Sequence, residues 1–499
     1  ILLVVGVCLA LGLTNRLWLC TALLIADLTL TDYAVPFTGG LSLRTILTAA
    51  VALAMGLAVL QRRVAFNRPL VPIIAALAVL AAIGTLSNVV NGTTTSTFLF
   101  RSLTGILIIV ILVGMVRGLR DLAIVFIPTL LVMILSAFTA VAQAYLHVGT
   151  VYVDPTFLAQ YAGRSFGLAQ TPIALGNDLV IAAAVLAGML LHMKWPRLAV
   201  IAGWVGVGVL LFGAYETGSR SIFVAAAAAA AVLFVSLYSR IPRPVFFLVL
   251  ILGAVVTVAA LPKVINGSGV TTRASSDLSD SSATRLVLWT AGVLIVRDHP
   301  LLGIGYGQFQ SVAPTYRAQV IRLLGGPTHA DEALGTLPVH NDFLMMWVSF
   351  GVVGFLAFLA MHLLAAWSLW RAWRSTQVRW LRALIAGCAA ALAAYAVHES
   401  FHNGFEDSLI VWFILGAAVM LNWMAGEMKR QVEGSQTPTP LFASVPPVSL
   451  SPTAPATVES AHISRISRAV TLRLKAGRAA PISRKKEPRP RRQQAPDRQ

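Results

Sequence analysis

The chain has 499 residues, of which 57% are hydrophobic and only 12% are charged, and its mean hydropathy is +0.78. Soluble domains carry roughly 25% charged residues, so this composition excludes a water-soluble globular enzyme. The 38 Lys and Arg against 20 Asp and Glu give a net charge of +18. In a soluble protein that balance would indicate binding to nucleic acid. Here the charges lie between apolar runs, so we expect no nucleic-acid partner.

Apolar runs of about 15 to 26 residues recur along the chain, each closed by a short polar stretch. A bilayer core about 30 Å thick is crossed by roughly 20 helical residues. The pattern therefore predicts an all-α protein, a polytopic transmembrane helical bundle, to which residues 1–13 could add a shortened thirteenth span. The twelve expected spans are residues 17–31, 45–60, 70–90, 103–116, 122–146, 168–193, 197–213, 221–239, 245–261, 341–365, 381–395 and 408–425.

The short loops between these runs divide into two alternating sets, one with thirteen Lys and Arg and the other with four. Positive loops stay in the cytoplasm, so we expect the basic set and the C-terminus inside and the longest connections, about 147–167 and 262–340, outside. Arg outnumbers Lys 32 to 6, which fits a G+C-rich bacterium. The expected location is a bacterial cytoplasmic membrane, with lipids around the bundle.

These expectations divide the chain into parts. Residues 1–426 should form the membrane domain, with residues 262–340 as an extracytoplasmic loop within it. From about residue 427, Pro, Ser, Thr and Arg replace the apolar runs, a composition typical of a disordered segment. We expect residues 427–499 to be a basic cytoplasmic tail.

The outer turn Thr217–Phe223 (TGSRSIF) contains a cation beside a span, where charge is expensive. We expect Ser219 to cap the next helix, which would put Arg220 in the first turn at the positive end of the helix dipole. Phosphate oxygens bound there would relieve the repulsion. An isolated Arg of this kind could instead snorkel to lipid head groups.

The stretch Ser282–Phe309 predicts an amphipathic helix near the membrane interface, with Arg285 in its first turn. The sequence GIGYG at 303–307 follows no strand, so we interpret it as a turn and not as a nucleotide loop. The apolar residues that recur at helical spacing are Leu286, Trp289, Val293 and Val296.

At Leu337–Leu359 the long loop re-enters the membrane. Asn341 or Asp342 can cap the helix that begins there. His340 would stand at the membrane mouth, where the positive helix end favours a neutral imidazole that can accept a proton. A lone interfacial His could also be only a polar anchor.

These three stretches, in this order, resemble the O-antigen ligase and polysaccharide polymerase family of membrane glycosyltransferases. The resemblance rests on the SR turn, the R-x3-W-x9-HPLLGIGYGQF run that starts at Arg285, and HNDFL followed by GVVGFL. An earlier segment, RSFGLAQTPIALGNDL at Arg164–Leu179, is similar to the family's R-x2-G segment. The resemblance covers about residues 160–365.

The resemblance implies a GT-C-like, inverting glycosyltransferase that needs neither metal nor other cofactor. Its partners would be a polyprenyl-diphosphate-linked glycan donor and a glycan or glycolipid acceptor, joined on the extracytoplasmic face. Arg220 and Arg285 would be catalytic ligands of the diphosphate, with Arg164 a weaker candidate for the same pocket. His340 would orient or deprotonate the acceptor hydroxyl. A ligase and a polymerase would share this donor site.

The sequence HESFH at His398–His402 matches the zinc-protease pattern H-E-x-x-H. Gly404 follows closely, the only later acidic groups nearby are Glu406 and Asp407 on the same outer turn, and no third-ligand motif follows in the last span. A membrane metalloprotease is therefore the lesser alternative, and no metal site is expected. We expect His398, Glu399 and His402, with Asn341, to border the acceptor cavity. A transporter of lipid-linked anions is another alternative, although transporters place polar residues at mid-membrane and here they gather at one face.

Overall fold

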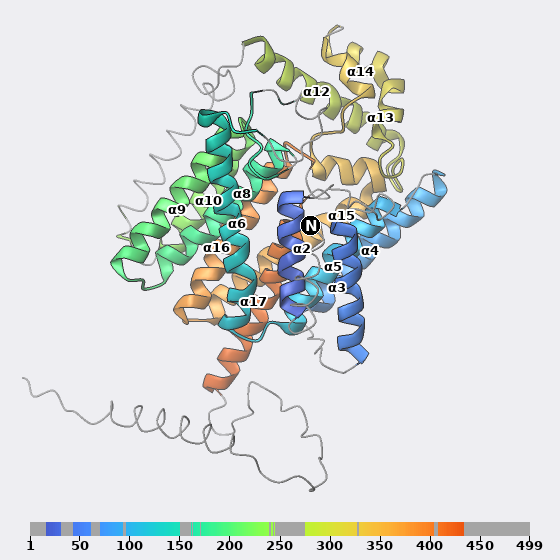
Figure 1. Ribbon diagram of the computed structural model, residues 1–499. Helices are drawn as coiled ribbons and strands as arrows, with labels where there is room; N and C mark the ends of the chain where they lie inside the picture. Colours follow the sequence, from blue (N-terminus) through green and yellow to red (C-terminus); the bar gives the residue numbers. More distant parts are fainter. Residues whose placement is uncertain are drawn as a thin grey trace, which may run out of the picture. The chain divides into compact units, whose positions relative to one another are not determined.

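Helices account for every regular element in the part of the chain that the structure describes, as the sequence predicts (Figure 1). All described residues belong to one of the two units into which the chain divides, residues 1–438. A computed structural model describes residues 16–30, 43–60, 70–92, 96–149, 161, 163–169, 171–238, 241–242, 244, 275–326, 329–403 and 408–433.

Eleven of the twelve expected spans coincide with helices, and the remaining one, 245–261, lies outside the described residues, as does 1–13. The eleven helices are α2 (Arg16–Leu30), α3 (Leu43–Leu60), α4 (Leu70–Val90), α5 (Ser96–Met115), α6 (Leu119–Leu146), α8 (Pro172–His192), α9 (Arg197–Glu216), α10 (Ser221–Ser236), α15 (Asp342–Ser375), α16 (Arg379–Glu399) and α17 (Ile410–Glu433).

Seven of these helices, α4, α6, α8, α9, α15, α16 and α17, contain stretches long and apolar enough to cross a membrane. The apolar parts of α2, α5 and α10 are shorter. The chain is therefore an integral membrane protein. Helix α17 runs to Glu433, with Arg430 paired to Glu427 at 2.8 Å, so the tail expected from residue 427 was placed too early.

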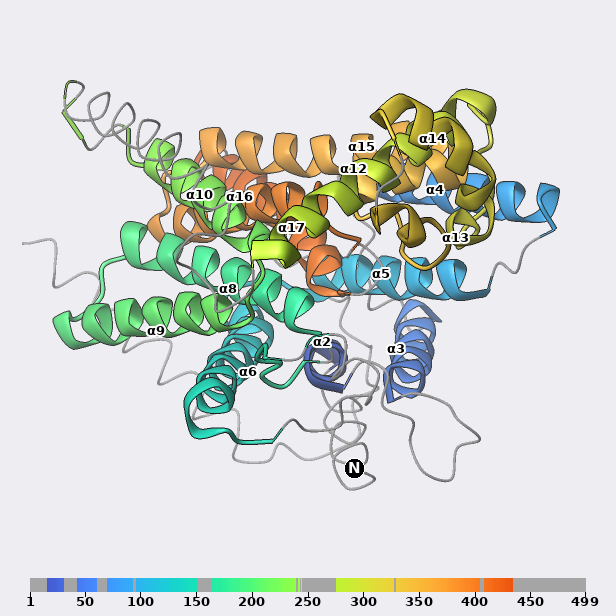
Figure 2. The same ribbon diagram turned by 90° about the horizontal axis from the view of Figure 1, so that it is seen from above.

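Helices α8 and α16 approach each other through glycines. A Cβ on Gly188 of α8 would lie 2.5 Å from the backbone of Gly387, and one on Gly387 would lie 2.8 Å from Val185. Small residues let helix backbones come this close in membranes. Helix α10 packs against both, α8 lies beside α9, and α4 lies beside α15 (Figure 2).

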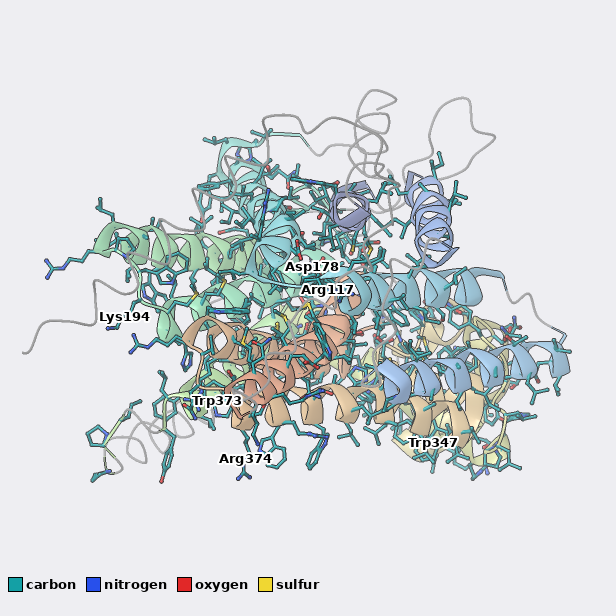
Figure 3. The ribbon with its side chains drawn as sticks, turned by 90° about the horizontal axis from the view of Figure 1, so that it is seen from below. Arg117, Asp178, Lys194, Trp347, Trp373 and Arg374 are labelled. Atoms are coloured by element: carbon teal, nitrogen blue, oxygen red, sulfur yellow. The ribbon has the colours of Figure 1, made fainter. Side chains whose placement is uncertain are left out.

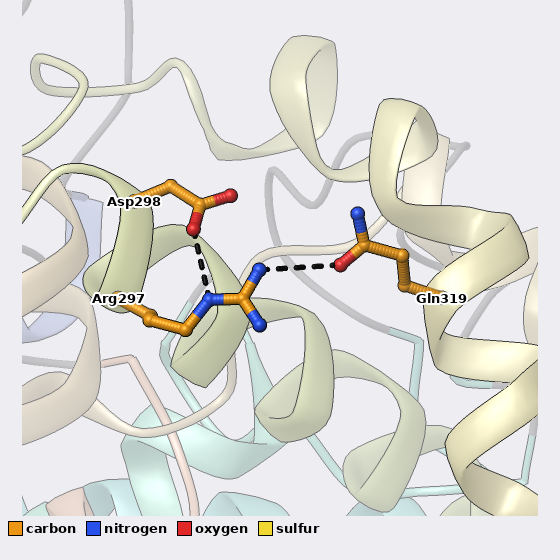
Figure 4. Close-up of polar contacts among 3 residues, drawn as sticks. All are labelled: Arg297, Asp298 and Gln319. Atoms are coloured by element: carbon orange, nitrogen blue, oxygen red, sulfur yellow. Dashed lines mark hydrogen bonds and ion pairs between the residues drawn. The ribbon is translucent and has the colours of Figure 1, made fainter.

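The segment between α10 and α15 has a hydrophobic core of its own. It contains α12 (Ser275–Asp298), α13 (Phe309–Val312), the 3-10 helices η2 (Ala313–Tyr316) and η3 (His329–Gly335), and α14 (Arg317–Leu324). Arg297 at the end of α12 donates to Asp298 Oδ1 at 2.9 Å and to Gln319 Oε1 at 3.4 Å, which joins α12 to α14 (Figure 4). The core residues include Val287, Leu288, Ala291, Ile295, Phe309, Val320, Leu334 and Val339.

The helix expected in this segment is confirmed. Some of its apolar residues are exposed and others are buried in the core of the segment. Leu286 and Val293 are 53% and 59% exposed, whereas Val287, Ala291 and Ile295 are buried. Positions 286–296 are apolar except for one Thr, so the spacing of apolar residues cannot single out one face.

The turn predicted at 303–307 is hydrogen-bonded to α15 at a point where that helix is interrupted. Gly351 has φ +67°, outside the helical region, and the loop at residues 300–305 forms hydrogen bonds with the interrupted backbone. Ile304 N–H donates to Val348 O at 2.9 Å, and Val352 N–H donates to Pro300 O at 2.8 Å. A Cβ on Gly303, also at positive φ, would lie 2.4 Å from Val348 O. Gly303 therefore allows close backbone contact with α15.

The bundle has two ends. At the one we call the site end, the first residues of α10 and α15 bond to residues at the end of α16. The opposite end carries the turns between α5 and α6, α8 and α9, and α15 and α16. Figure 3 labels Lys194 in the turn between α8 and α9, and Trp373 and Arg374 in the last turn of α15. The described loops of the basic set lie at the opposite end. Which end faces the cytoplasm stays a prediction.

Candidate functional site

Arg285 lies on α12, and its position corrects the sequence interpretation. Helix α12 begins at Ser275, so Arg285 lies in its third turn and not in its first. The side chain is half-buried. Burial and the nearby guanidinium of Arg220 lower the pKa of Arg285. Two cations from different helices therefore lie close enough to repel each other.

Arg220 is the N-cap residue of α10, and it makes no side-chain capping hydrogen bond. The expected cap, Ser219, is wrong: its Oγ lies 3.0 Å from Ser221 Oγ instead. The helix begins one residue later than expected, so the N-cap residue is Arg220. Its side chain contains no oxygen atom that could accept a hydrogen bond from the first N–H groups of the helix. A helix N-terminus with a guanidinium beside it is suited to an anion.

The turn before Arg220 is in contact with Arg164. A Cβ on Gly218, which has φ +66°, would lie 3.5 Å from Arg164 Cγ, and the Arg164 guanidinium lies 5.3 Å from the centroid of the Tyr161 ring. Ser165 N–H donates to Glu216 O at 3.2 Å. The structure thus brings Arg164 beside the turn that carries Arg220.

The loop that carries Arg164 is held by Gln143 of α6, a residue that sequence reasoning missed. Its Oε1 accepts the N–H groups of Phe166 and Gly167, both at 2.8 Å. Its Nε2 donates to Gly167 O at 3.0 Å. Nothing in the sequence around Gln143 distinguishes it from any other polar residue of a span, so only the tertiary contact identifies it.

His340 immediately precedes α15, as expected. Asn341 is the N-cap of this helix, accepting Leu344 N–H at 3.0 Å, which confirms one of the two predicted caps. Burial, followed by the charge of Arg285, lowers the pKa of His340 to about 4. The imidazole is therefore neutral at neutral pH and able to accept a proton.

Two further imidazoles lie beside His340. The ring of His402 stacks on it, with centroids 5.8 Å apart and planes at 18°. The ring of His398 lies edge-on to His402 at 5.6 Å, and its Nδ1 is 3.1 Å from Ser221 Oγ, at the first residue of α10. Burial, with the neighbouring histidines and Arg285, lowers the pKa of His402 well below its ordinary value. The three histidines therefore connect the start of α15 to the start of α10.

The HESFH sequence does not lie on one helix. Helix α16 ends at Glu399, which is fully buried, and His402 lies beyond it. The zinc-protease arrangement needs both histidines one turn apart on a helix. Over the described ranges, no group of three or more His, Cys, Asp or Glu residues is arranged to hold a metal ion.

Asn403 is another residue of this site that sequence reasoning missed. Its Oδ1 accepts the N–H of His340, and its Nδ2 donates to Asp342 Oδ1 at 3.1 Å. The available signal was the Asn-Gly pair at 403–404, which is typical of a turn. That signal indicates where α16 ends but not which residue the Asn side chain contacts.

A known protein family matches the part of the chain that contains Arg220 and Arg285. Residues 205–359, less than a third of the chain, match the family model described as O-antigen ligase. The matched segment includes Arg220, Arg285 and His340, and it confirms the resemblance to the O-antigen ligase and polymerase family there. No curated protein matches the chain.

Proposed function

We propose that this integral membrane protein, with its O-antigen ligase segment, transfers a glycan from a polyprenyl-diphosphate carrier to the hydroxyl of a glycan or glycolipid acceptor. The reaction is inverting and needs no metal, and it takes place on the extracytoplasmic face of a bacterial cytoplasmic membrane. The observation that carries the proposal is the approach of Arg285 to Arg220 at the start of α10, within the matched segment.

The donor diphosphate accounts for this pairing of cations. Two guanidinium groups near each other raise the electrostatic energy of the empty site, and a diphosphate would offset it. Arg binds phosphate oxygens through two parallel N–H groups. Arg220 and Arg285 would hold the diphosphate, and they would bind it more strongly as the bond to the sugar breaks and negative charge grows on the leaving group. Arg164 is a weaker candidate for the same contact.

The acceptor side of the reaction is assigned to His340. Its neutral imidazole takes the proton of the acceptor hydroxyl as that oxygen bonds to the anomeric carbon. The bond from the anomeric carbon to the diphosphate breaks at the same time, and its electron pair leaves with the diphosphate. Attack from the side opposite the leaving group inverts the anomeric configuration. Asn341 and His402, which are partly exposed, would border the acceptor. His398 and Glu399, which were expected there too, are buried.

The proposal is tested by incubating purified protein with a defined polyprenyl-diphosphate glycan and candidate acceptors, with products read by mass spectrometry. Arg220→Ala should lower the rate about ten- to a few-hundredfold, since a charged hydrogen bond contributes roughly 1.5–3 kcal/mol and each 1.36 kcal/mol is about tenfold in rate. Arg220→Lys should rescue poorly because an ammonium group lacks the planar fork. A chelator should leave the rate unchanged.

The matched control is Arg297→Ala. Arg297 is an exposed arginine of α12 that pairs with Asp298, so its loss should leave transfer near the wild-type rate. Retention of more than half of the wild-type rate by folded Arg220→Ala would contradict the donor site. Activity lost to a chelator and restored by zinc would contradict the metal-independent reaction.

A further inference from the structure

His340 has a backbone conformation that a non-glycine residue adopts only under constraint. Its φ is +56°, and among the described non-glycine residues only His147 shares a positive φ. Such a conformation has an energetic cost and persists where surrounding contacts determine it. His147 follows the last residue of α6, a common place for this geometry, whereas His340 precedes a helix. The contacts around His340 therefore need a separate explanation.

The contacts come from the turn after α16. Asn403 Oδ1 accepts the His340 N–H, and Asn403 Nδ2 donates to Asp342 Oδ1 at 3.1 Å. In the other direction, Asn341 Nδ2 donates to Ser400 O at 3.1 Å. Hydrogen bonds in both directions thus join the turn at 340–342 to the turn at 400–403.

The same turn also places a ring against the His340 side chain. His402 immediately precedes Asn403, and its imidazole stacks on that of His340 with an interplanar angle of 18°. The His340 ring is therefore flanked by another side chain of the protein, which limits the orientations that the ring can take. Backbone and side chain of His340 are both held by two consecutive residues.

We propose that Asn403 is a positioning residue for His340, fixing its backbone while His402 fixes its ring. The proposal rests on the acceptor role proposed for His340. It gives the HESFHN sequence a role other than metal binding. Its last two residues, His402 and Asn403, set the direction in which the His340 imidazole meets the acceptor hydroxyl. Proton transfer depends on such alignment, and a displacement of about 1 Å can lower a rate about a hundredfold.

The first test compares Asn403→Ala with Ser87→Ala. The Ser87 hydroxyl lies 2.6 Å from Leu302 O and 2.9 Å from Ser349 O, so its loss also removes buried contacts between distant segments, but not at His340. Asn403→Ala should lower kcat about ten- to a hundredfold and change KM for the donor less than twofold, because the arginines are untouched. Ser87→Ala, with a matched melting temperature, should keep kcat near wild type.

A second test does not depend on whether Asn403→Ala folds. Asn403→Asp places a carboxylate against that of Asp342 and should lower kcat as strongly. Adding Asp342→Asn exchanges donor and acceptor, so that residue 403 again accepts from His340 and pairs with residue 342. The double variant should recover kcat to within about threefold of wild type, a rescue that loss of a merely structural contact would not predict.

His340→Ala separates the two proposals. If it keeps wild-type transfer, the acceptor role of His340 fails and the positioning role fails with it. If His340→Ala loses transfer while Asn403→Ala and His402→Ala both keep more than half of kcat, only the positioning role fails. A folded double variant as slow as Asn403→Asp would also overturn the positioning role.

Discussion

Helix α10 begins and ends with a serine that bonds to a histidine of a neighbouring helix, and the two ends differ in what surrounds that bond. At the site end, Ser221 Oγ lies 3.1 Å from His398 Nδ1. At the opposite end, Ser236 Oγ lies 2.9 Å from His192 Nε2. The local bond is nearly the same in length and in kind. Differences in behaviour between the ends must therefore come from the neighbouring groups.

The arginines of the opposite end lie against rings and carbonyl groups. The Arg382 guanidinium lies 4.9 Å from the centroid of the Trp373 ring, and its Nε donates to Thr376 O at 2.9 Å. Such contacts stabilise a cation locally. At the site end, Arg285 lies near Arg220, and burial together with the charge of Arg220 lowers the pKa of Arg285. Arg382 at the opposite end is thus stabilised by protein groups, whereas at the site end the proposed function supplies an anion as the partner of Arg220 and Arg285.

The largest contrast is expected between His340→Ala and His192→Ala. General acid–base groups contribute typically 10²–10⁴-fold, so His340→Ala should lower transfer at least about a hundredfold with little change in stability. His192 is buried against Trp373, and its loss should lower the free energy of unfolding by about 1–3 kcal/mol while the folded protein keeps its rate. Transfer rates and melting curves on matched preparations measure both effects.

Either of two results would contradict the expected difference between His340→Ala and His192→Ala. Wild-type transfer by folded His340→Ala would remove the distinction between the ends, as would a hundredfold loss in folded His192→Ala. Expression level alone does not decide, because His192→Ala is expected to yield less folded protein.

A second contrast concerns arginines. Arg285→Ala should lower transfer about ten- to a few-hundredfold, since a contact to the leaving diphosphate is lost. Arg382→Ala should lower transfer less than about twofold and cost about 0.5–2 kcal/mol of stability, because Arg382 is half-buried and cation–π contacts span this range from exposed to desolvated sites. Initial rates at saturating donor distinguish the two. A rate for Arg285→Ala above half of wild type would remove the evidence that crowded cations mark the donor site.

A third contrast is in pH dependence. The neutral form of His340 is the proposed proton acceptor, and its pKa is lowered to about 4, so transfer should be level from about pH 8 to 5 and fall as pH drops through about 4. If His340 had the ordinary pKa of a histidine, about 6.5, half of the rate would already be lost at about pH 6.5. Arg285→Gln removes a cause of the lowered pKa, so the fall of its residual activity should move to higher pH. Arg382→Gln should leave the fall where it is. A wild-type midpoint near 6.5 would contradict the assigned state of His340.

The sequence predicts the helices well and their ends poorly. Apolar runs and polar breaks are visible in the local sequence, and they located eleven spans. The cap of α10 depends on a shift of one residue, from Ser219 to Arg220. The break at Gly351 lies within GVVGFL, which is apolar enough for an uninterrupted span.

The site was predictable in part, and mainly through the family resemblance. Periodicity alone does not bring Arg220, Arg285 and His340 together, because they are separated by more than fifty residues each. Motif order indicated all three residues. Asn403 was missed because its contact to His340 spans 63 positions, and no local pattern encodes that distance.

The smallest contrast is between the two serines of α10. Ser221→Ala leaves His398 Nδ1 without its hydroxyl partner at the site end, and Ser236→Ala does the same to His192 Nε2 at the opposite end. A neutral hydrogen bond contributes roughly 0.5–1.5 kcal/mol, so both variants should lose similar stability. Only Ser221→Ala should also slow transfer, by about two- to tenfold, because His398 adjoins His402 and, through it, His340. Melting curves and transfer rates measured together give the result. If both serines lower the rate equally, the histidine at the site end does no more than its counterpart at the opposite end, and its proximity to His340 has no part in the reaction.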